Sequence, residues 1–229
     1  MEYFYTPPRN IASGTLTIDG EEFAHLTHVM RKHAGDAIRV VDGVGHAFDV
    51  TIEEMTKRAA QCSIRGTYHR LHEPHVDVTI AVGLLKNGSS FDFLVEKCTE
   101  LGVNTIVPLI TERTIPRHAK TDRWQKIALA AMKQSERCVL PSVKPLMPFH
   151  DFIIQDTSEL KIIPHEKSEA RLVVPTAASI TICIGPEGGF ADGEIAVASD
   201  AGFTSVSLGI RRLRTETAAI TAVARMLAA

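Results

Sequence analysis

The spacing of apolar residues divides the chain into two halves with different rhythms. In the first half, short stretches alternate apolar and polar side chains, as half-buried strands do, at 15–18, 37–41, 46–52 and 61–65. One stretch, from Asp19 or Glu21 to about His33, instead spaces its apolar residues as a helix does. Strands this short and close predict a small barrel or sandwich interrupted by one helix.

After residue 75 the rhythm changes to strand, loop and helix. Strands are expected at 76–82, 105–110, 160–163, 180–184 and 206–208, and helices at 89–101, 122–136, 192–201 and 215–227. This alternation predicts a parallel sheet covered on both faces. Pro108 places its strand toward an edge, because proline donates no hydrogen bond. The polar stretch 69–75 is the expected linker, which gives domains at 1–72 and 73–229.

Composition narrows the class of protein. With 229 residues, of which 45% are hydrophobic and 23% charged, the chain is typical of globular proteins. A net charge of −2 excludes a protein that coats nucleic acid without specificity, because such proteins are basic. The sequence shows four widely spaced cysteines, no signal peptide and no long apolar run. We therefore expect a soluble cytoplasmic protein with free thiols and no membrane partner.

Candidate chemistry lies in the loops that follow strands, because ligands of open α/β sheets bind at the carboxyl ends of strands. Strands ending at Ile163, Ile184 and Leu208 lead into such loops. The middle loop, 185–190, reads Gly-Pro-Glu-Gly-Gly-Phe, and its glycines allow a close approach to a ligand. It matches neither the dinucleotide pattern nor the phosphate-loop pattern. A ligand-binding loop and a tight turn are equally good interpretations of it.

Basic residues gather just before the last predicted helix, at Arg211, Arg212 and Arg214. Each exposed cation at a helix N-terminus costs about 0.3–1 kcal/mol. The arginines therefore either meet something anionic or electron-rich, or pair with carboxylates such as Glu216. Basic clusters around Arg31 and Arg113 are either solvated surface or an RNA footprint. No metal site is expected, because the histidines lack ligand partners at zinc-like spacing.

These loops carry a family resemblance. Residues 184–190 and 208–219 resemble the paired signatures of the RsmE family of SPOUT methyltransferases. Further segments match in order and spacing, at 25–31, 35–36, 96–103, 112–113, 124–127 and 130–135. The resemblance implies an α/β fold in which a small N-terminal PUA-like β-barrel binds RNA. The C-terminal domain would be a SPOUT trefoil-knot domain with a parallel sheet.

The resemblance also implies an activity and a site. The family methylates N3 of a uridine in small-subunit (16S) ribosomal RNA with S-adenosylmethionine, as a homodimer. The implied cofactor residues are Ile163, His165, Gly185, Glu187, Gly188, Leu208, Gly209 and Leu213. For catalysis we expect Arg211 or Arg214 to stabilise the uracil anion, with Glu187 a less favoured proton acceptor. The expected RNA contacts are Arg31, Arg113 and, from the second subunit, Arg137.

Two positions depart from the family pattern. Ile210 stands where proline is usual, and Glu136 stands where a glycine usually precedes Arg137. Two other functions stay open. The chain could be a non-catalytic RNA-binding or ribosome-assembly protein on the same fold, against which its intact cofactor loops argue. It could also be a SPOUT methyltransferase of transfer RNA, against which the first-domain signature argues.

Overall fold

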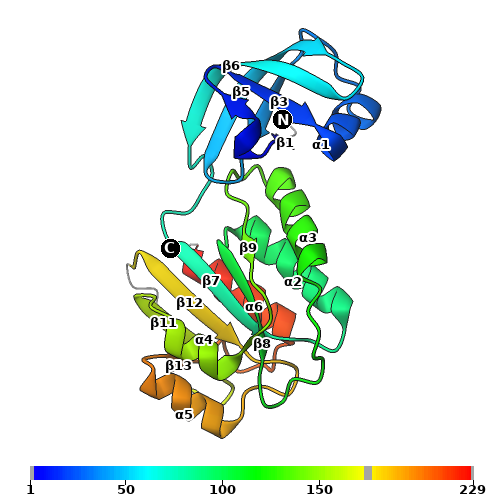
Figure 1. Cartoon of the computed structure of the whole chain (residues 1–229). Coiled ribbons are helices and arrows are strands. Elements are labelled where there is room, and N and C mark those ends of the chain that lie inside the picture. Colours follow the sequence, from blue (N-terminus) through cyan, green and yellow to red (C-terminus); the bar gives the residue numbers. More distant parts are fainter. Residues whose placement is uncertain (1–2, 173–176, 228–229) are drawn as a thin grey trace. The chain divides into compact units, whose positions relative to one another are not determined.

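The computed structural model describes residues 3–172 and 177–227, and the chain divides into two compact units (Figure 1). Unit 1 is Met1–Glu73 with Leu129–Leu140, and unit 2 is Pro74–Ala128 with Pro141–Ala229. The expected boundary after residue 72 lies one residue from the observed division. Residues 129–140, which the sequence placed in the second domain, group instead with the first.

Unit 1 is built on a six-stranded sheet in the order β1-β4-β5-β6-β3-β2. These strands are Tyr3–Tyr5, Ala37–Val41, His46–Met55, Ala59–His69, Thr15–Asp19 and Ile11–Ala12, and a 3-10 turn, η1, spans Pro8–Asn10. All pairings are antiparallel except that of β1 with β4. Thr6, just after β1, donates its hydroxyl to the Thr17 carbonyl of β3 at 2.6 Å, which joins segments near the two ends of the strand order. Strands β1 and β2 were not expected, because they are too short to show alternation.

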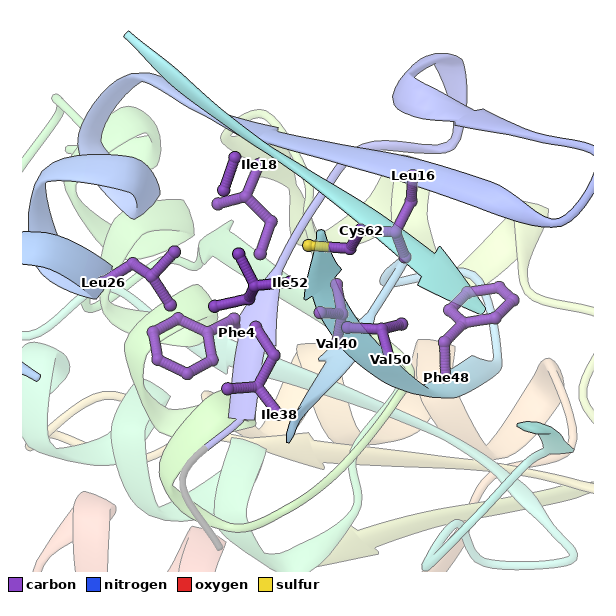
Figure 2. Close-up of a cluster of buried hydrophobic side chains, with 11 residues drawn as sticks. Phe4, Leu16, Ile18, Leu26, Ile38, Val40, Phe48, Val50, Ile52 and Cys62 are labelled. Atoms are coloured by element: carbon purple, nitrogen blue, oxygen red, sulfur yellow. The ribbon is translucent and has the colours of Figure 1, made fainter. Parts of the chain in front are cut away.

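The alternating pattern of the first half fills one core. Phe48, Val50 and Ile52 of β5 point into it together with Ile38 and Val40 of β4 (Figure 2). The opposite face of the sheet is also covered within unit 1. There Tyr3, Val41 and Ala47 pack with Met132 and Cys138, so residues 129–140 form a second layer over this sheet.

The single helix expected in the first half is shorter and irregular. Helix α1 spans Gly20–Ala24 and continues as a π-helical turn, η2, over His25–Val29. The backbone N–H of Met30 bonds to the His25 carbonyl at 3.0 Å, five residues back. The helix ends before His33 because Arg31 has a left-handed φ of 51°, which stops the helical path.

Unit 2 contains the parallel sheet that the sequence predicts. The order is β10-β8-β7-β12-β11-β13, with β9 also paired to β8, and every pairing is parallel. Strands β7 to β13 are Asp77–Gly83, Thr105–Ile110, Ser142–Val143, Met147–Pro148, Leu160–Pro164, Ser179–Ile184 and Thr204–Val206. The last strand ends at Val206, two residues before the expected 208, so the loop after it is longer.

Pro108 does not place its strand at an edge. Strand β8 has β7 on one side and two short strands on the other. Of these, β9 pairs with Thr105 and Ile106, and β10 pairs with Leu109 and Ile110. Pro108 therefore falls in the gap between the two short strands, where no N–H donor is required.

Helices cover both faces of this sheet (Figure 1). Helices α2 (Gly88–Leu101) and α6 (Thr215–Leu227) pack together on one face, beside β7 and β12. Helices α4 (Phe149–Gln155) and α5 (Asp192–Asp200) cover the other face, over Phe190, Phe203 and neighbouring strand residues. Helix α4 was not expected from the sequence. No helix in the described residues has the length and apolar character needed to cross a membrane.

Helix α3 spans Thr121–Gln134 and ends at the glycine-to-glutamate departure. Glu136 has a φ of 58°, in the left-handed region. Its N–H bonds to the Lys133 carbonyl at 3.2 Å, and that of Arg137 bonds to the Met132 carbonyl at 3.0 Å. These two bonds form a Schellman motif, so the helix keeps the usual glycine ending without the glycine.

Candidate functional site

The carboxyl ends of neighbouring strands in unit 2 bring the three candidate loops to one edge of the sheet. Because the sheet is parallel, the loops after β12, β11 and β13 emerge side by side. Ile163 is buried within β11, and the N–H of His165 bonds to the Val206 carbonyl at 3.0 Å. The loop after β11 is joined further to β13, because Ser207 donates its N–H to the Ala170 carbonyl at 2.7 Å.

The glycine loop that follows β12 is both a tight turn and a close-packed surface. The N–H of Gly189 bonds to the Pro186 carbonyl at 2.8 Å, and Gly189 has a φ of 69°. A Cβ on Gly185 would lie 3.0 Å from the backbone of Gly189 and Phe190. At the end of β7, a Cβ on Gly83 would lie 2.5 Å from Cδ of Pro186. The loop therefore needs glycine within itself and in the strand beside it.

Two neighbouring segments fasten this loop, and the sequence did not single out their contacts. Oε1 of Glu187, which is exposed, accepts the backbone N–H of Lys86 at 2.8 Å. On the other side, Nη1 of Arg113 donates to the Gly188 carbonyl at 2.8 Å. The residue before it, Glu112, donates its N–H to Glu194 in α5 at 2.8 Å. Bonds that span 75 to 101 residues leave no local pattern, so only the tertiary structure reveals them.

The loop after β13 presents the arginines. Arg211, Arg212 and Arg214 are exposed, and in the described residues none of them makes an ion pair or a side-chain hydrogen bond. Glu216, their nearest expected partner in sequence, instead accepts a bond from Ser90 of α2 at 3.4 Å. The pairing alternative is thus not realised in the described part of the chain.

The same loop has an open backbone. Gly209 has a φ of 127° and nothing within 4 Å of an added Cβ, while Ile210 is 99% exposed. Leu208 and Leu213 are half-buried on either side. A single exposed apolar side chain is common on protein surfaces and does not by itself indicate a site. The features that distinguish this loop are its open backbone at Gly209 and its unpaired arginines.

One ion pair links two of the segments at this edge. Lys167 contacts Asp192 at 2.7 Å and lowers the pKa of that carboxyl, with smaller contributions from Arg113 and His165. Asp192 begins α5, directly after the glycine loop. The loops after β8, β11 and β12 therefore share one electrostatic environment.

The residues present fit S-adenosylmethionine. The glycine loop offers backbone groups with no side-chain bulk, and the half-buried Leu208 and Leu213 offer apolar surface. Ile163 is fully buried, so it contributes through the core that supports the loop after β11. Small-molecule sites typically combine apolar lining with a few placed polar groups. A flat adenine ring with a polar amino-acid tail requires that combination.

Two expected RNA-contacting arginines lie in unit 1 rather than at this edge. Arg31 is exposed, at the end of η2. Arg137 is only 2% exposed, and its Nη2 and Nε donate to Oε2 of Glu73 at 2.7 and 3.1 Å. The other oxygen of Glu73 accepts the N–H groups of Cys138 and Val139, each at 2.8 Å.

This pairing corrects the expectation for Arg137. A guanidinium buried against a buried carboxylate is not offered to RNA, and removing either partner would leave an uncompensated charge. Arg137 therefore holds the residues after α3 to the end of the linker. The sequence could not show this, because Glu73 lies 64 residues away.

Comparison with known families assigns both parts of the chain. Residues 72–227 match the RNA methyltransferase domain family, and residues 18–65 match the RNA methyltransferase PUA domain family. The first match covers the parallel sheet and all the loops described above. The second covers most of the six-stranded sheet of unit 1.

Individual relatives agree with these matches. The chain is 34% identical to ribosomal RNA small subunit methyltransferase E of Synechocystis sp., over 96% of this chain and 75% of that protein. It is 30% identical to the Aquifex aeolicus protein of the same name, over 99% of both. A crystal structure of the Neisseria gonorrhoeae methyltransferase E bound to S-adenosyl methionine superposes with a TM-score of 0.89 and 33% identity, covering 99% of this chain and 96% of that one.

Proposed function

Because this chain belongs to the RNA methyltransferase family that includes the ribosomal RNA small subunit methyltransferases E, we propose that it methylates N3 of a uridine in small-subunit ribosomal RNA. It is an S-adenosylmethionine-dependent methyltransferase of the 16S RNA. The choice of N3 rests on the family resemblance of the loops at 184–190 and 208–219. The observation that carries the proposal is the meeting of these loops at one edge of the parallel sheet.

We assign the cofactor to the loops after β11, β12 and β13. When bound, S-adenosylmethionine supplies an electrophilic methyl group on its sulfonium. The contribution of this chain is position, because a methyl group in line with the attacking nitrogen lowers the barrier entropically. The residues proposed to hold the cofactor are Ile163, His165, Gly185, Glu187, Gly188, Leu208, Gly209 and Leu213.

The arginines of the β13 loop are proposed to stabilise charge. N3 of uracil becomes a good nucleophile only as its proton leaves, and the resulting anion is shared with the flanking oxygens. A guanidinium stabilises such an anion and is too weak a base to remove the proton. Arg211 and Arg214 are exposed and unpaired in the described residues, which suits this role. Glu187 is a less favoured proton acceptor, because it already accepts a bond from Lys86.

The RNA partner sets further requirements. N3 lies on the pairing edge of uracil, so the target must be unpaired when it is methylated. Arg31 is the RNA contact that we propose in unit 1, because it is exposed in the PUA domain. We further propose a homodimer that acts in the cytoplasm on RNA within the small subunit. Size measurement in solution and co-sedimentation with subunits test these two points.

The first experiment identifies the product. Small subunits from a strain lacking the enzyme are incubated with this protein and labelled S-adenosylmethionine. The RNA is then digested, and its nucleosides are identified by mass spectrometry. We expect 3-methyluridine. A different methylated nucleoside would refute the target atom. Methylation of transfer RNA alone would support the transfer RNA alternative. Absence of both cofactor binding and methylation would support the non-catalytic one.

The second experiment tests the anion-stabilising role. We expect Arg214→Ala to lower kcat about a hundredfold or more, because it removes a positive donor from the developing charge. Cofactor affinity should change much less. Arg212→Ala is the matched control, since Arg212 is also exposed and carries no assigned role. Turnover of Arg214→Ala near that of wild type would disprove the assignment.

A further inference from the structure

We propose that Arg113 is a positioning residue that holds the glycine loop in its cofactor-binding shape, rather than a contact for RNA. This inference rests on the proposed function of that loop. Arg113 lies in the exposed segment after β8, and its guanidinium donates to the Gly188 carbonyl at 2.8 Å. A basic cluster in the sequence favoured an RNA contact, whereas the geometry points to the protein's own backbone.

The side chain of Arg113 lies along the loop as well as bonding to it. A Cβ on Gly188 would lie 3.2 Å from Cβ of Arg113 and 3.3 Å from its Cδ. The arginine stem therefore fills the space that a side chain at 188 would occupy. Its charge also acts nearby, since it contributes to lowering the pKa of Asp192, where α5 begins.

The backbone that carries Arg113 is itself fixed. Thr111 and Thr114 are buried, and their side-chain oxygens lie 2.9 Å apart. The N–H of Thr111 bonds to Oγ1 of Thr114 at 2.9 Å, and that of Thr114 to the Thr111 carbonyl at 3.1 Å. The turn therefore fixes the backbone position from which the Arg113 side chain reaches Gly188.

The same turn also controls the far end of the loop. Glu112 donates its N–H to Oε1 of Glu194, and Oε2 of Glu194 accepts the N–H of Ala191, each at 2.8 Å. Adjacent residues 112 and 113 thus fasten the loop at its middle and at its junction with α5. Opposite them, Glu187 is bound to the N–H of Lys86. The glycine loop is held from the ends of β8 and β7 at once.

The consequence concerns affinity for the cofactor. A loop with glycines at 185, 188 and 189 has many backbone conformations, and binding requires one of them. A charge-assisted bond to its central carbonyl raises the population of that one, which lowers the ordering cost of binding.

The test separates cofactor affinity from RNA affinity. Arg113→Met keeps the apolar stem against Gly188 and removes the donor. We expect its dissociation constant for S-adenosylmethionine, measured by calorimetry without RNA, to rise about tenfold. Its affinity for a small-subunit RNA fragment, and the salt dependence of that affinity, should be those of wild type. Arg113→Lys should recover part of the cofactor affinity, because lysine retains a charged donor.

Arg117→Ala is the matched control. Arg117 is exposed on the same segment and makes no hydrogen bond or ion pair in the described residues, so its loss should leave cofactor affinity unchanged. If Arg113 contacted a phosphate, Arg113→Met would instead weaken RNA binding and lower the salt slope by about one. That result, or unchanged cofactor affinity in Arg113→Met, would overturn the inference. Wild-type protein that does not bind S-adenosylmethionine would refute the proposed function instead.

Discussion

Glu136 shows at the scale of one residue how this chain tolerates a departure from its family. It stands at the end of α3 where the family pattern has glycine, and the helix still closes with both bonds of a Schellman motif. The left-handed conformation costs a residue with a Cβ about 1–2 kcal/mol. Nearby, Arg137 is buried against Glu73, which gives the segment a fixed path independent of that strain.

The strain at Glu136 predicts a stabilising substitution. Glu136→Gly removes the Cβ clash, and the greater freedom of glycine in the unfolded chain offsets only part of that gain. We expect the free energy of unfolding in urea to rise by about 0.5 kcal/mol or more. Glu136→Gln keeps the Cβ and loses the exposed ion pair that Oε2 makes with Nδ1 of His72 at 4.0 Å, so it should lower that free energy by about 0–1 kcal/mol. A glycine variant no more stable than the glutamine variant would show that the conformation is not strained.

At the scale of elements, the ends of the parallel strands are shaped to meet one loop. Strand β7 ends in Gly83 because the glycine loop after β12 passes against it. The turn after β8 meets the same loop through Arg113. The shape of the glycine loop therefore depends on strand order as well as on the loop sequence. Strand β7 lies beside β12, with β8 next to β7, only in the folded sheet.

This packing predicts the effect of one methyl group. A Cβ at residue 83 would lie 2.5 Å from Cδ and 2.7 Å from the backbone nitrogen of Pro186, so Gly83→Ala must displace the loop. We expect a loss of about 1–3 kcal/mol in unfolding free energy and weaker binding of S-adenosylmethionine. Gly193→Ala in α5 is the control, because nothing lies within 4 Å of its added Cβ. Equal cofactor affinity in the two variants would contradict the close approach.

At the scale of the whole molecule, the four cysteines are distributed over both units. Cys62 and Cys138 lie in unit 1, in different clusters, and Cys98 and Cys183 lie in unit 2. Burial raises the pKa of the Cys98 thiol to about 12 and those of Cys62 and Cys138 to about 11, and it also raises that of Cys183 well above its ordinary value. The thiolate is the reactive form, so all four should be inert while the chain is folded.

Thiol labelling therefore reports on unfolding of each unit. At about pH 8 we expect no thiol of the folded protein to react with a thiol reagent, and all four to react in denaturant. Unfolded thiols ionise from about pH 9, below the folded values, so the unfolded state binds fewer protons there. The thiol contribution to stability is thus complete below about pH 9 and decreases as the pH rises toward 11–12. Rapid labelling of any one cysteine in the folded protein would show that the side chains packed around it open.

The sequence by itself determined much of the architecture and the chemistry. Apolar periodicity located the long strands β5, β7 and β12 and the helices α2, α3, α5 and α6, because each spans enough residues to repeat its pattern. The signatures at 184–190 and 208–219 identified the family, which the comparisons confirmed. Whether the listed residues of those loops contact the cofactor stays a prediction. The trefoil knot also stays a prediction, since strand order alone does not define the path of the chain.

Only the tertiary structure decided what long-range contacts do. It placed residues 129–140 in unit 1, gave Pro108 a place inside the sheet, buried Arg137 against Glu73 and set Arg113 on Gly188. None of these follows from local pattern. For the two arginines the reason is that a basic side chain has the same appearance in a sequence whether its partner is RNA, a carboxylate or a carbonyl. The partner is chosen by which segments the sheet brings together, and that choice belongs to the fold.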